Sequence, residues 1–261
     1  MDNTDTYAES NGYNDPTQYI EYVNHVDTSF NTLFDHALSN GLKWIPWVGK
    51  EYTKAAVKVL VIGESHYSAP EQFAYFDNRR DATQYIIWES RIPVWEAGNQ
   101  GWHNRTFDGI EYTLTGTKNV TERQQLWEHL AFYNFIQRPM NTIKERPSQR
   151  DFELGWEAFI HIVRELKPDV CIFCGVSAAN YFNSKMQDMN IKHRSVSVNP
   201  NYARTASVNI EERDINMIFI HHCGGRFYSW SKWHNYLRNE IPDTINFLNK
   251  LATTHADNTH H

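Results

Sequence analysis

Residues 130–182 constrain the fold of this chain more than any other segment, because short apolar runs there alternate with segments of helical periodicity. The first helical segment ends at Lys167-Pro168, since proline cannot continue a helix. The second apolar run ends at Gly175, ahead of the next helical segment. Strands that alternate with helices are typical of units built around a parallel sheet. We therefore predict strands at 131–136 and 170–174 and helices at 149–166 and 177–185.

The same alternation continues on both sides of this segment. Residues 55–62 are almost continuously apolar and end at Gly63, the pattern of a parallel strand buried on both faces. Residues 68–120 show no clear periodicity, and we expect irregular structure there. The chain is therefore predicted to be an α/β protein, a three-layer α/β/α sandwich with a mostly parallel central sheet. Further strands are expected at 194–198, 206–210 and 217–221, and further helices at 16–39, 121–129, 229–240 and 243–252.

The length of the chain suits a single domain. Its 261 residues can bury a substantial core, and no repeat or flexible linker divides them. The first residues are polar and lack a packed pattern, which is typical of a loose terminus. We predict a flexible N-terminus at 1–15, one α/β domain at 16–253 and a flexible tail at 254–261.

Cysteine usage and hydropathy indicate the compartment. Three cysteines in a chain of this length argue against a disulfide scaffold and favour a reducing environment. Cys171 and Cys174 fall within one predicted strand, where positions three apart face opposite sides, so we expect core packing. The N-terminus is not a signal peptide, and no apolar run reaches membrane-spanning length. We predict a cytoplasmic protein that does not enter a membrane.

Charge and aromatic content bear on possible partners. The net charge is −6 and the sequence pI is about 6.1, so no global field draws this chain toward nucleic acid. A nonspecific coating of phosphates is therefore disfavoured, although a local basic cleft is compatible with these values. Aromatic residues make up 14% of the chain, which offers stacking surfaces for flat ligands as well as core.

Polar residues follow three of the predicted strands. Ligands of open parallel sheets bind beyond the carboxyl ends of the strands. Glu64 to Tyr67 follow the first strand, Asn134 and Arg138 lie at the end of the second, and His221-His222 with Arg226 follow the last. We expect these loops to converge on one concave site. His66 is expected to be a structural polar residue within the first loop.

The order of parts resembles the uracil-DNA glycosylase superfamily, especially its iron–sulfur branch. In that branch a strand with Y-x-x-N, an R-P turn, an N-R-x-P segment, a helix and a K-P-x-hydrophobic-G-x-x-A segment follow one another. This chain has Tyr133-Asn134, Arg138-Pro139, an amphipathic helix and Lys167-Pro168 in a similar order. The resemblance implies the superfamily's α/β/α fold and a base-binding pocket at the strand ends.

Two further loops also resemble motifs of the superfamily. With them, the resemblance covers about residues 57–237, except for 68–120. The loop at 63–67 is similar to the superfamily's water-activating motif, and residues 218–230 are similar to its second motif, a strand followed by H-P-S. His222 is placed at the motif histidine, with His221 as the rival. The first loop lacks the motif's proline, and His222 is not followed by Pro-Ser.

The activity that the resemblance implies is hydrolysis of the N-glycosidic bond of a damaged or deaminated base in DNA. A carboxylate can orient water and stabilise an oxocarbenium-like sugar, and a histidine can stabilise the charge on the leaving base. By resemblance, Glu64 would act on water, His222 on a base oxygen, and Asn134 on the base edge. Tyr67 and Phe107 are the candidates for stacking on an extruded base.

The expected DNA contacts are Arg138, in the R-P turn, and Arg226 and Phe227. The last two lie in the loop after the second motif, which enters the duplex in the superfamily. Trp230 and Trp233 follow this loop, and we expect them to pack within an amphipathic helix. No cofactor is expected. The chain lacks the four cysteines of the iron–sulfur branch, and the His-His-Cys run that ends at Cys223 has no compact fourth ligand for zinc.

Two other classes of function remain open on the same fold. One is a non-catalytic module that binds a nucleobase or nucleic acid, which would show stacking aromatics and arginine without the catalytic pair. The other is a protein-interaction domain with a filled cleft and a flat apolar patch. The sequence predicts neither the base that is bound nor the oligomeric state.

Overall fold

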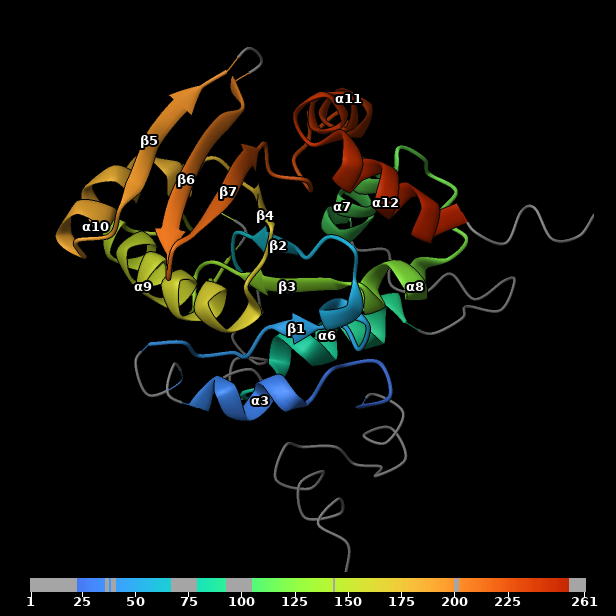
Figure 1. The fold of residues 1–261 in the computed structure, drawn as a ribbon, viewed down its shortest axis with the longest axis horizontal. Helices are drawn as coiled ribbons and strands as arrows, with labels where there is room; N and C mark the ends of the chain where they lie inside the picture. The colour runs from blue at the N-terminus through green and yellow to red at the C-terminus, as the bar shows by residue number, and fades with distance from the viewer. Residues whose placement is uncertain are drawn as a thin grey trace, which may run out of the picture.

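The computed structural model describes residues 23–35, 38, 41–66, 79–92, 105–142, 144–199 and 202–253. This part of the chain has an α/β fold with a seven-stranded sheet in the order β1-β3-β2-β4-β7-β6-β5 (Figure 1). The strands are β1 (Trp47–Val48), β2 (Val59–Gly63), β3 (Leu130–Asn134), β4 (Val170–Cys174), β5 (His193–Val198), β6 (Arg204–Ile210) and β7 (Arg213–Ile220).

The centre of the sheet is parallel. β3, β2, β4 and β7 lie side by side and run in the same direction. Every residue of β2, β3 and β4 is buried, as expected for strands covered on both faces. The register pairs Gly63 with Asn134 and Cys174 with Ile220. The carboxyl ends of the four strands therefore lie along one edge of the sheet.

The two sides of the sheet are antiparallel. β1 pairs with β3, β5 with β6, and β6 with β7 in opposite directions. The sheet is therefore mixed, and the prediction of a mostly parallel sheet is wrong outside its centre. The turn that joins β6 to β7 contains Glu211 and Glu212, whose φ angles are 50° and 65°. Two positive φ angles fit a two-residue hairpin, but the usual signal of Asn-Gly or Asp-Gly is absent here.

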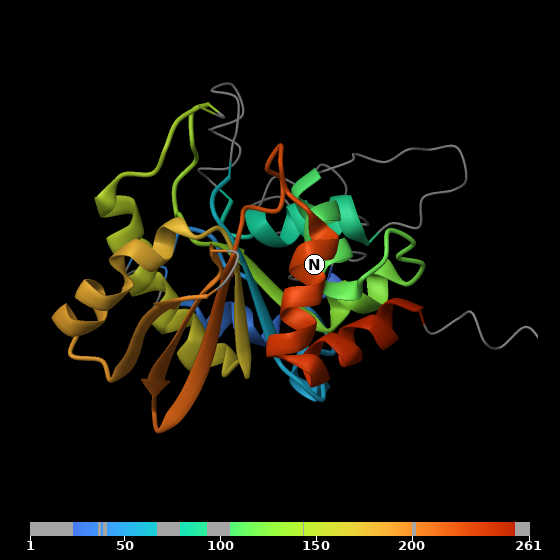
Figure 2. The ribbon, with the colours of Figure 1, turned by 90° about the horizontal axis from the view of Figure 1, so that it is seen from above.

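Helices cover both faces of the sheet (Figures 1 and 2). In β2, Leu60 and Ile62 belong to one hydrophobic cluster, whereas Val59 and Val61 belong to the other. The alternation along a strand thus divides the core into two layers with the sheet between them. The first cluster includes residues of α3 (Ser29–Leu33), α9 (Gln149–Leu166), η3 (Ser177–Tyr181) and α10 (Phe182–Asp188), and the second includes residues of α6 (Ala82–Arg91), α7 (Arg105–Thr115), α8 (Arg123–Glu128), α11 (Trp230–Glu240) and α12 (Pro242–Thr253).

Helix α9 has clear signals at both ends, and its bounds match the sequence prediction. The Ser148 side chain accepts from the Asp151 backbone, and the Asp151 side chain accepts from the Ser148 backbone, which forms a capping box. At the other end Lys167 adopts the left-handed conformation with φ of 47° before Pro168. The bounds of β4 also match, because its apolar run ends sharply at Gly175.

Several expectations on the first half of the chain are wrong. Residues 68–120 were expected to be irregular, but they contain α6 and α7. A continuous helix over 16–39 is excluded, because Val26 forms a bridge with Gly49 and α3 begins only at Ser29. β1 and the short helix η1 (Tyr52–Lys54) were not expected either. The predicted flexible ends, 1–15 and 254–261, lie outside the described residues.

The buried cysteines lie where the strand pattern predicted. Cys171 packs in the cluster under α9, and Cys174 packs in the cluster on the opposite face. Both are free thiols. Among the described residues, no helix combines the length and the apolar character needed to cross a bilayer.

Candidate functional site

The loops after β2, β3 and β7 leave the same edge of the sheet, toward the top of Figure 2. The first two are joined beyond the strands, because the Phe135 amide donates to the Gly63 carbonyl at 2.9 Å and the Ile136 amide donates to the Glu64 carbonyl at 2.9 Å. These bonds extend the parallel pairing by one step and fix Glu64 at the strand end. Glu64, Asn134 and His222 therefore lie at the same edge of the sheet, as we expected.

Glu64 faces the segment that follows β4. A Cβ atom at Gly175 would lie 3.5 Å from Glu64 Oε1, so the missing side chain leaves one flank of the carboxylate uncovered. A narrow cavity of about 10 Å³ lies beside Glu64, lined also by Phe135, Phe152 and Phe173. This volume suits a single water molecule and is far too small for a nucleobase. A base could therefore reach only the mouth of this cavity.

Of the two adjacent histidines, His222 is the one whose pKa is affected by the charge of Glu64. The Gly224 amide donates to His222 Nδ1 at 3.2 Å, so the neutral ring carries its proton on Nε2. Burial lowers the pKa of His222, and the negative charge of Glu64 opposes this shift. His221 instead lies against the ring of Trp233, with 4.9 Å between ring centroids. The structure thus places His222, the favoured one of the two histidines, nearer the carboxylate.

Asn134 is tied to His66 within the same edge. Asn134 Nδ2 lies 3.0 Å from His66 Nε2, and Thr83 Oγ1 lies 3.2 Å from the same nitrogen. Burial lowers the pKa of His66 to about 4, so this ring is neutral at physiological pH. His66 also packs edge-on against Trp44 at 4.8 Å. His66 is thus buried and contacts Asn134, Thr83 and Trp44, the arrangement expected for a structural polar residue.

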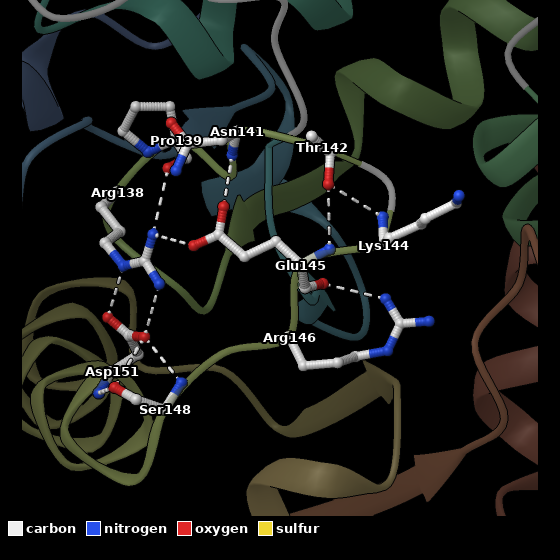
Figure 3. A network of polar contacts seen from close by, with 9 residues as sticks. All are labelled: Arg138, Pro139, Asn141, Thr142, Lys144, Glu145, Arg146, Ser148 and Asp151. Atoms are coloured by element: carbon white, nitrogen blue, oxygen red, sulfur yellow. Dashed lines mark hydrogen bonds and ion pairs between the residues drawn. The ribbon is translucent and has the colours of Figure 1, made fainter.

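Arg138 is enclosed by two carboxylates (Figure 3). Its Nε and Nη2 atoms donate to Asp151 at 2.7 and 2.9 Å, and Nη1 donates to Glu145 at 2.7 Å. These bonds raise the pKa of Arg138 and lower the pKa of Asp151 to about 2. A phosphate that binds here must compete with the carboxylates of Asp151 and Glu145. The geometry therefore favours a role for Arg138 in ordering the loop over the DNA contact that we expected.

Arg146 is a candidate that sequence reasoning missed. Its Nη1 atom donates to the carbonyl of Glu145 at 2.9 Å, at the end of the loop that Arg138 organises (Figure 3). The positive charge of Arg146 helps to lower the pKa of His222. Arg146 therefore contributes positive potential at His222. The only sequence signal was an arginine followed by proline ahead of α9.

Phe107 was expected to stack on a ligand, but the structure places it in the core. Its side chain is 5% exposed and packs edge-on against Trp127 and Phe132 with centroids at 5.7 and 5.5 Å. The ring belongs to the core between α7 and the sheet, so it cannot stack on a ligand. Sequence position alone could not show this, because 68–120 was not assigned any helix. Tyr67, the other stacking candidate, lies outside the described residues.

The loop after β7 sits directly on α7. A Cβ atom at Gly109 would approach the Cys223 carbonyl oxygen closer than 3.0 Å, and one at Gly224 would do the same with Thr106 Oγ1. Arg105 Nη2 donates to the carbonyls of Gly225 and Arg226, at 3.2 and 3.3 Å. Close backbone approach of this kind requires glycine. Helix α7 is therefore the support that positions His222.

The tip of this loop is open to solvent. Phe227 is 92% exposed, and the guanidinium of Arg226 lies 5.6 Å from its ring centroid. Trp233, in contrast, is buried in the core as predicted, and Trp230 packs against Tyr112 at 6.2 Å. An exposed aromatic ring beside an arginine is able to stack on a base and contact a phosphate. Both side chains are therefore exposed at the tip of the loop that carries His222.

The arrangement as a whole combines a carboxylate, a neutral imidazole with a proton on Nε2, and a nearby guanidinium. Such groups can orient water and stabilise a leaving anion. Within the described ranges, no three His, Cys, Asp or Glu side chains form a group able to hold a metal ion. A search against protein-family models and a search of the curated proteins each found no match to this chain.

Proposed function

We propose that this protein hydrolyses an N-glycosidic bond of a damaged or deaminated base in DNA, on a fold of the uracil-DNA glycosylase type. The observation that carries the proposal is the placement of Glu64 and His222 at the carboxyl ends of β2 and β7, which flank β4. Strands lie about 4.8 Å apart, so the two strand ends are about 10 Å apart. In the proposed mode of binding, a water molecule and a sugar lie between the two side chains.

The proposed reaction uses each group once. Glu64 orients a water molecule and accepts its proton while the water oxygen bonds to the anomeric carbon. The bond from that carbon to the base nitrogen breaks, and its electron pair leaves with the base. The Nε2 proton of His222 donates a hydrogen bond to the oxygen on which the negative charge develops. Arg146 adds positive charge on the same side, and the departing base takes a proton from solvent.

Asn134 remains the candidate for reading the base edge. Within the described residues its Oδ1 atom makes no hydrogen bond, whereas Nδ2 is engaged by His66. A Cβ atom at Gly63 would collide with Oδ1, so glycine at this position leaves the amide in its place. The free acceptor could pair with a ring N–H of a pyrimidine. We therefore assign Asn134 to base selection and His66 to its orientation.

DNA is the proposed partner because Arg226 and Phe227 extend from the loop that also carries His222. An acidic chain that touches few phosphates should show weak binding with a shallow dependence on salt. Phe227 could fill the stack that an extruded base leaves, which is worth about 1–3 kcal/mol. Replacing it with alanine should therefore weaken binding to lesion-bearing strands by roughly 5- to 150-fold.

The test is release of a base from oligonucleotides that carry uracil or a damaged base, in single and double strands. Cleavage of the abasic product by alkali reports the reaction. Glu64→Gln and His222→Gln are expected to reduce the rate by at least about a hundredfold. Glu165→Gln, which changes an exposed carboxylate of α9, is the matched control. Equal rates for Glu64→Gln and the wild type would contradict the mechanism, and binding without any release would favour the non-catalytic module.

A further inference from the structure

A second cavity lies on the other side of the loop after β7. It has a volume of about 310 Å³ and lies between α7, this loop and the start of α11. Arg105, Asp108 and Tyr112 line it from α7, at a spacing that places them on one face of the helix. The volume falls within the range of small-molecule sites, whereas the cavity beside Glu64 does not. None of these three residues takes part in the reaction steps proposed above, although Arg105 donates to the loop after β7.

The walls of this cavity are aromatic. Tyr112 and Trp230 line it with their rings nearly perpendicular, at 70° and 6.2 Å between centroids. Tyr228 also lines it, and its hydroxyl lies 2.6 Å from Thr113 Oγ1 and 3.3 Å from Cys223 Sγ. The phenol is therefore held in one orientation by its polar end. Fixed aromatic walls of this kind suit a planar ring, because stacking needs no side-chain reordering on binding.

The rim of the cavity favours an anion. Arg105 and Lys118 contribute two exposed cations, and Asp108 contributes the one carboxylate among the lining residues. That carboxylate is already paired, because Arg91 Nη1 donates to Asp108 at 2.8 Å. The N-terminal end of α7, which begins at Arg105, adds further positive potential. The rim is thus locally positive on a chain whose net charge is −6.

We propose that this cavity binds a planar aromatic ring that bears a phosphate, as in a nucleotide, and that the bound phosphate engages Arg105 and Lys118. Arg105 also donates to the carbonyls of Gly225 and Arg226. A ligand that recruits this guanidinium therefore acts on the loop that carries His222. The inference does not depend on the glycosidase proposal, because binding of a nucleotide is measured without any turnover.

Calorimetric titration of the full chain with thymidine 5′-monophosphate is the direct test. Thymidine lacks the charge and inorganic phosphate lacks the ring, so each should bind at least about tenfold more weakly. A short oligothymidylate forms a separate arm, which distinguishes a free nucleotide from one within a strand. Binding of either phosphorylated form supports the site, provided that it depends on the residues below. Absence of binding for both at millimolar concentration overturns it.

Four substitutions, one of them a control, locate the bound ligand. Trp230→Leu should weaken binding by about 5- to 150-fold, whereas Trp230→Phe should restore most of the affinity because it keeps an aromatic face. Lys118→Gln should weaken binding and reduce its dependence on salt. Lys192→Gln, an equal change of charge on an exposed residue that does not line the cavity, should have no effect. Equal affinity of wild type and Trp230→Leu would show that the ligand binds elsewhere, and a thermal melt checks that each variant is folded.

Discussion

Gly109→Ala tests how strongly the geometry of the site depends on the contact between α7 and the loop after β7. The added Cβ atom would overlap the carbonyl oxygen of Cys223 and lie 3.1 Å from its carbonyl carbon. Both are backbone atoms, which cannot rotate away as the end of a side chain could. To reach an ordinary contact distance, the loop must withdraw from α7 by about 1 Å.

The expected change in stability is small because two effects oppose each other. Forcing an extra methyl group into a packed contact destabilises a protein by about 1–3 kcal/mol. Alanine in place of glycine inside a helix contributes about 0.5–1 kcal/mol in the other direction. The net result is a loss of about 1 kcal/mol, which corresponds to a fall in Tm of about 2–4 °C for a chain of this size.

The expected effect of Gly109→Ala on the rate of reaction is much larger than its effect on stability. His222 precedes Cys223 directly, so withdrawal of the loop from α7 displaces the imidazole relative to Glu64. A misplacement of about 1 Å can reduce a rate by about a hundredfold. The pKa of His222 should also change, because both its burial and its distance from the negative charge of Glu64 set that pKa. Gly109→Ala should therefore impair the site far more than it destabilises the fold.

Three measurements check this prediction: a thermal melt, an NMR titration of the His222 ring, and the base-release assay. The ring signal is assigned by its absence in His222→Gln. Asn235→Ala is the control, because this residue is exposed on α11 and the change increases helix propensity without a clash. A Gly109→Ala protein that melts above the wild type with an unchanged His222 titration would refute the reasoning.

Three further predictions concern residues whose roles the structure assigns. His66 has its pKa lowered to about 4, so its burial as a neutral ring stabilises the fold fully above pH 6.5, and this contribution is lost as the pH falls toward 4. The loss is about 3 kcal/mol, and urea unfolding at both pH values should show it in the wild type but not in a His66→Phe variant. Asp151→Asn should destabilise the fold by about 1 kcal/mol at pH 7, since Arg138 is partly exposed. The difference from wild type should shrink as the pH falls from 3.8 toward 2, where the Asp151 carboxyl of the wild type is itself protonated. Phe107→Ala should lower the free energy of unfolding by about 3–5 kcal/mol, whereas Phe227→Ala should change it by less than about 0.5 kcal/mol; equal melts would contradict their assignment to core and surface.

The sequence by itself determined the parallel centre of the sheet and the positions of residues at its carboxyl edge. The reason is that a strand buried on both faces leaves a continuous apolar run, and a glycine or polar residue marks its end. β4 and α9 could be bounded to the residue because Pro168, Gly175 and the Ser148 cap act locally. The placement of Glu64, Asn134 and His222 at one edge follows from the same pattern.

Tertiary structure alone decided what each side chain contacts. Nothing in the sequence distinguishes Phe107 in the core from Phe227 in solvent, because burial depends on which distant segments meet. The sequence suggested that Arg138 was available to bind DNA, whereas in the fold it pairs with Asp151 and Glu145. The antiparallel pair β6–β7 is joined by a turn of two glutamates in the left-handed conformation, which no local propensity favours. The cavity at Trp230 exists only because α7 packs against the loop after β7 and the start of α11, which lie far from α7 along the chain.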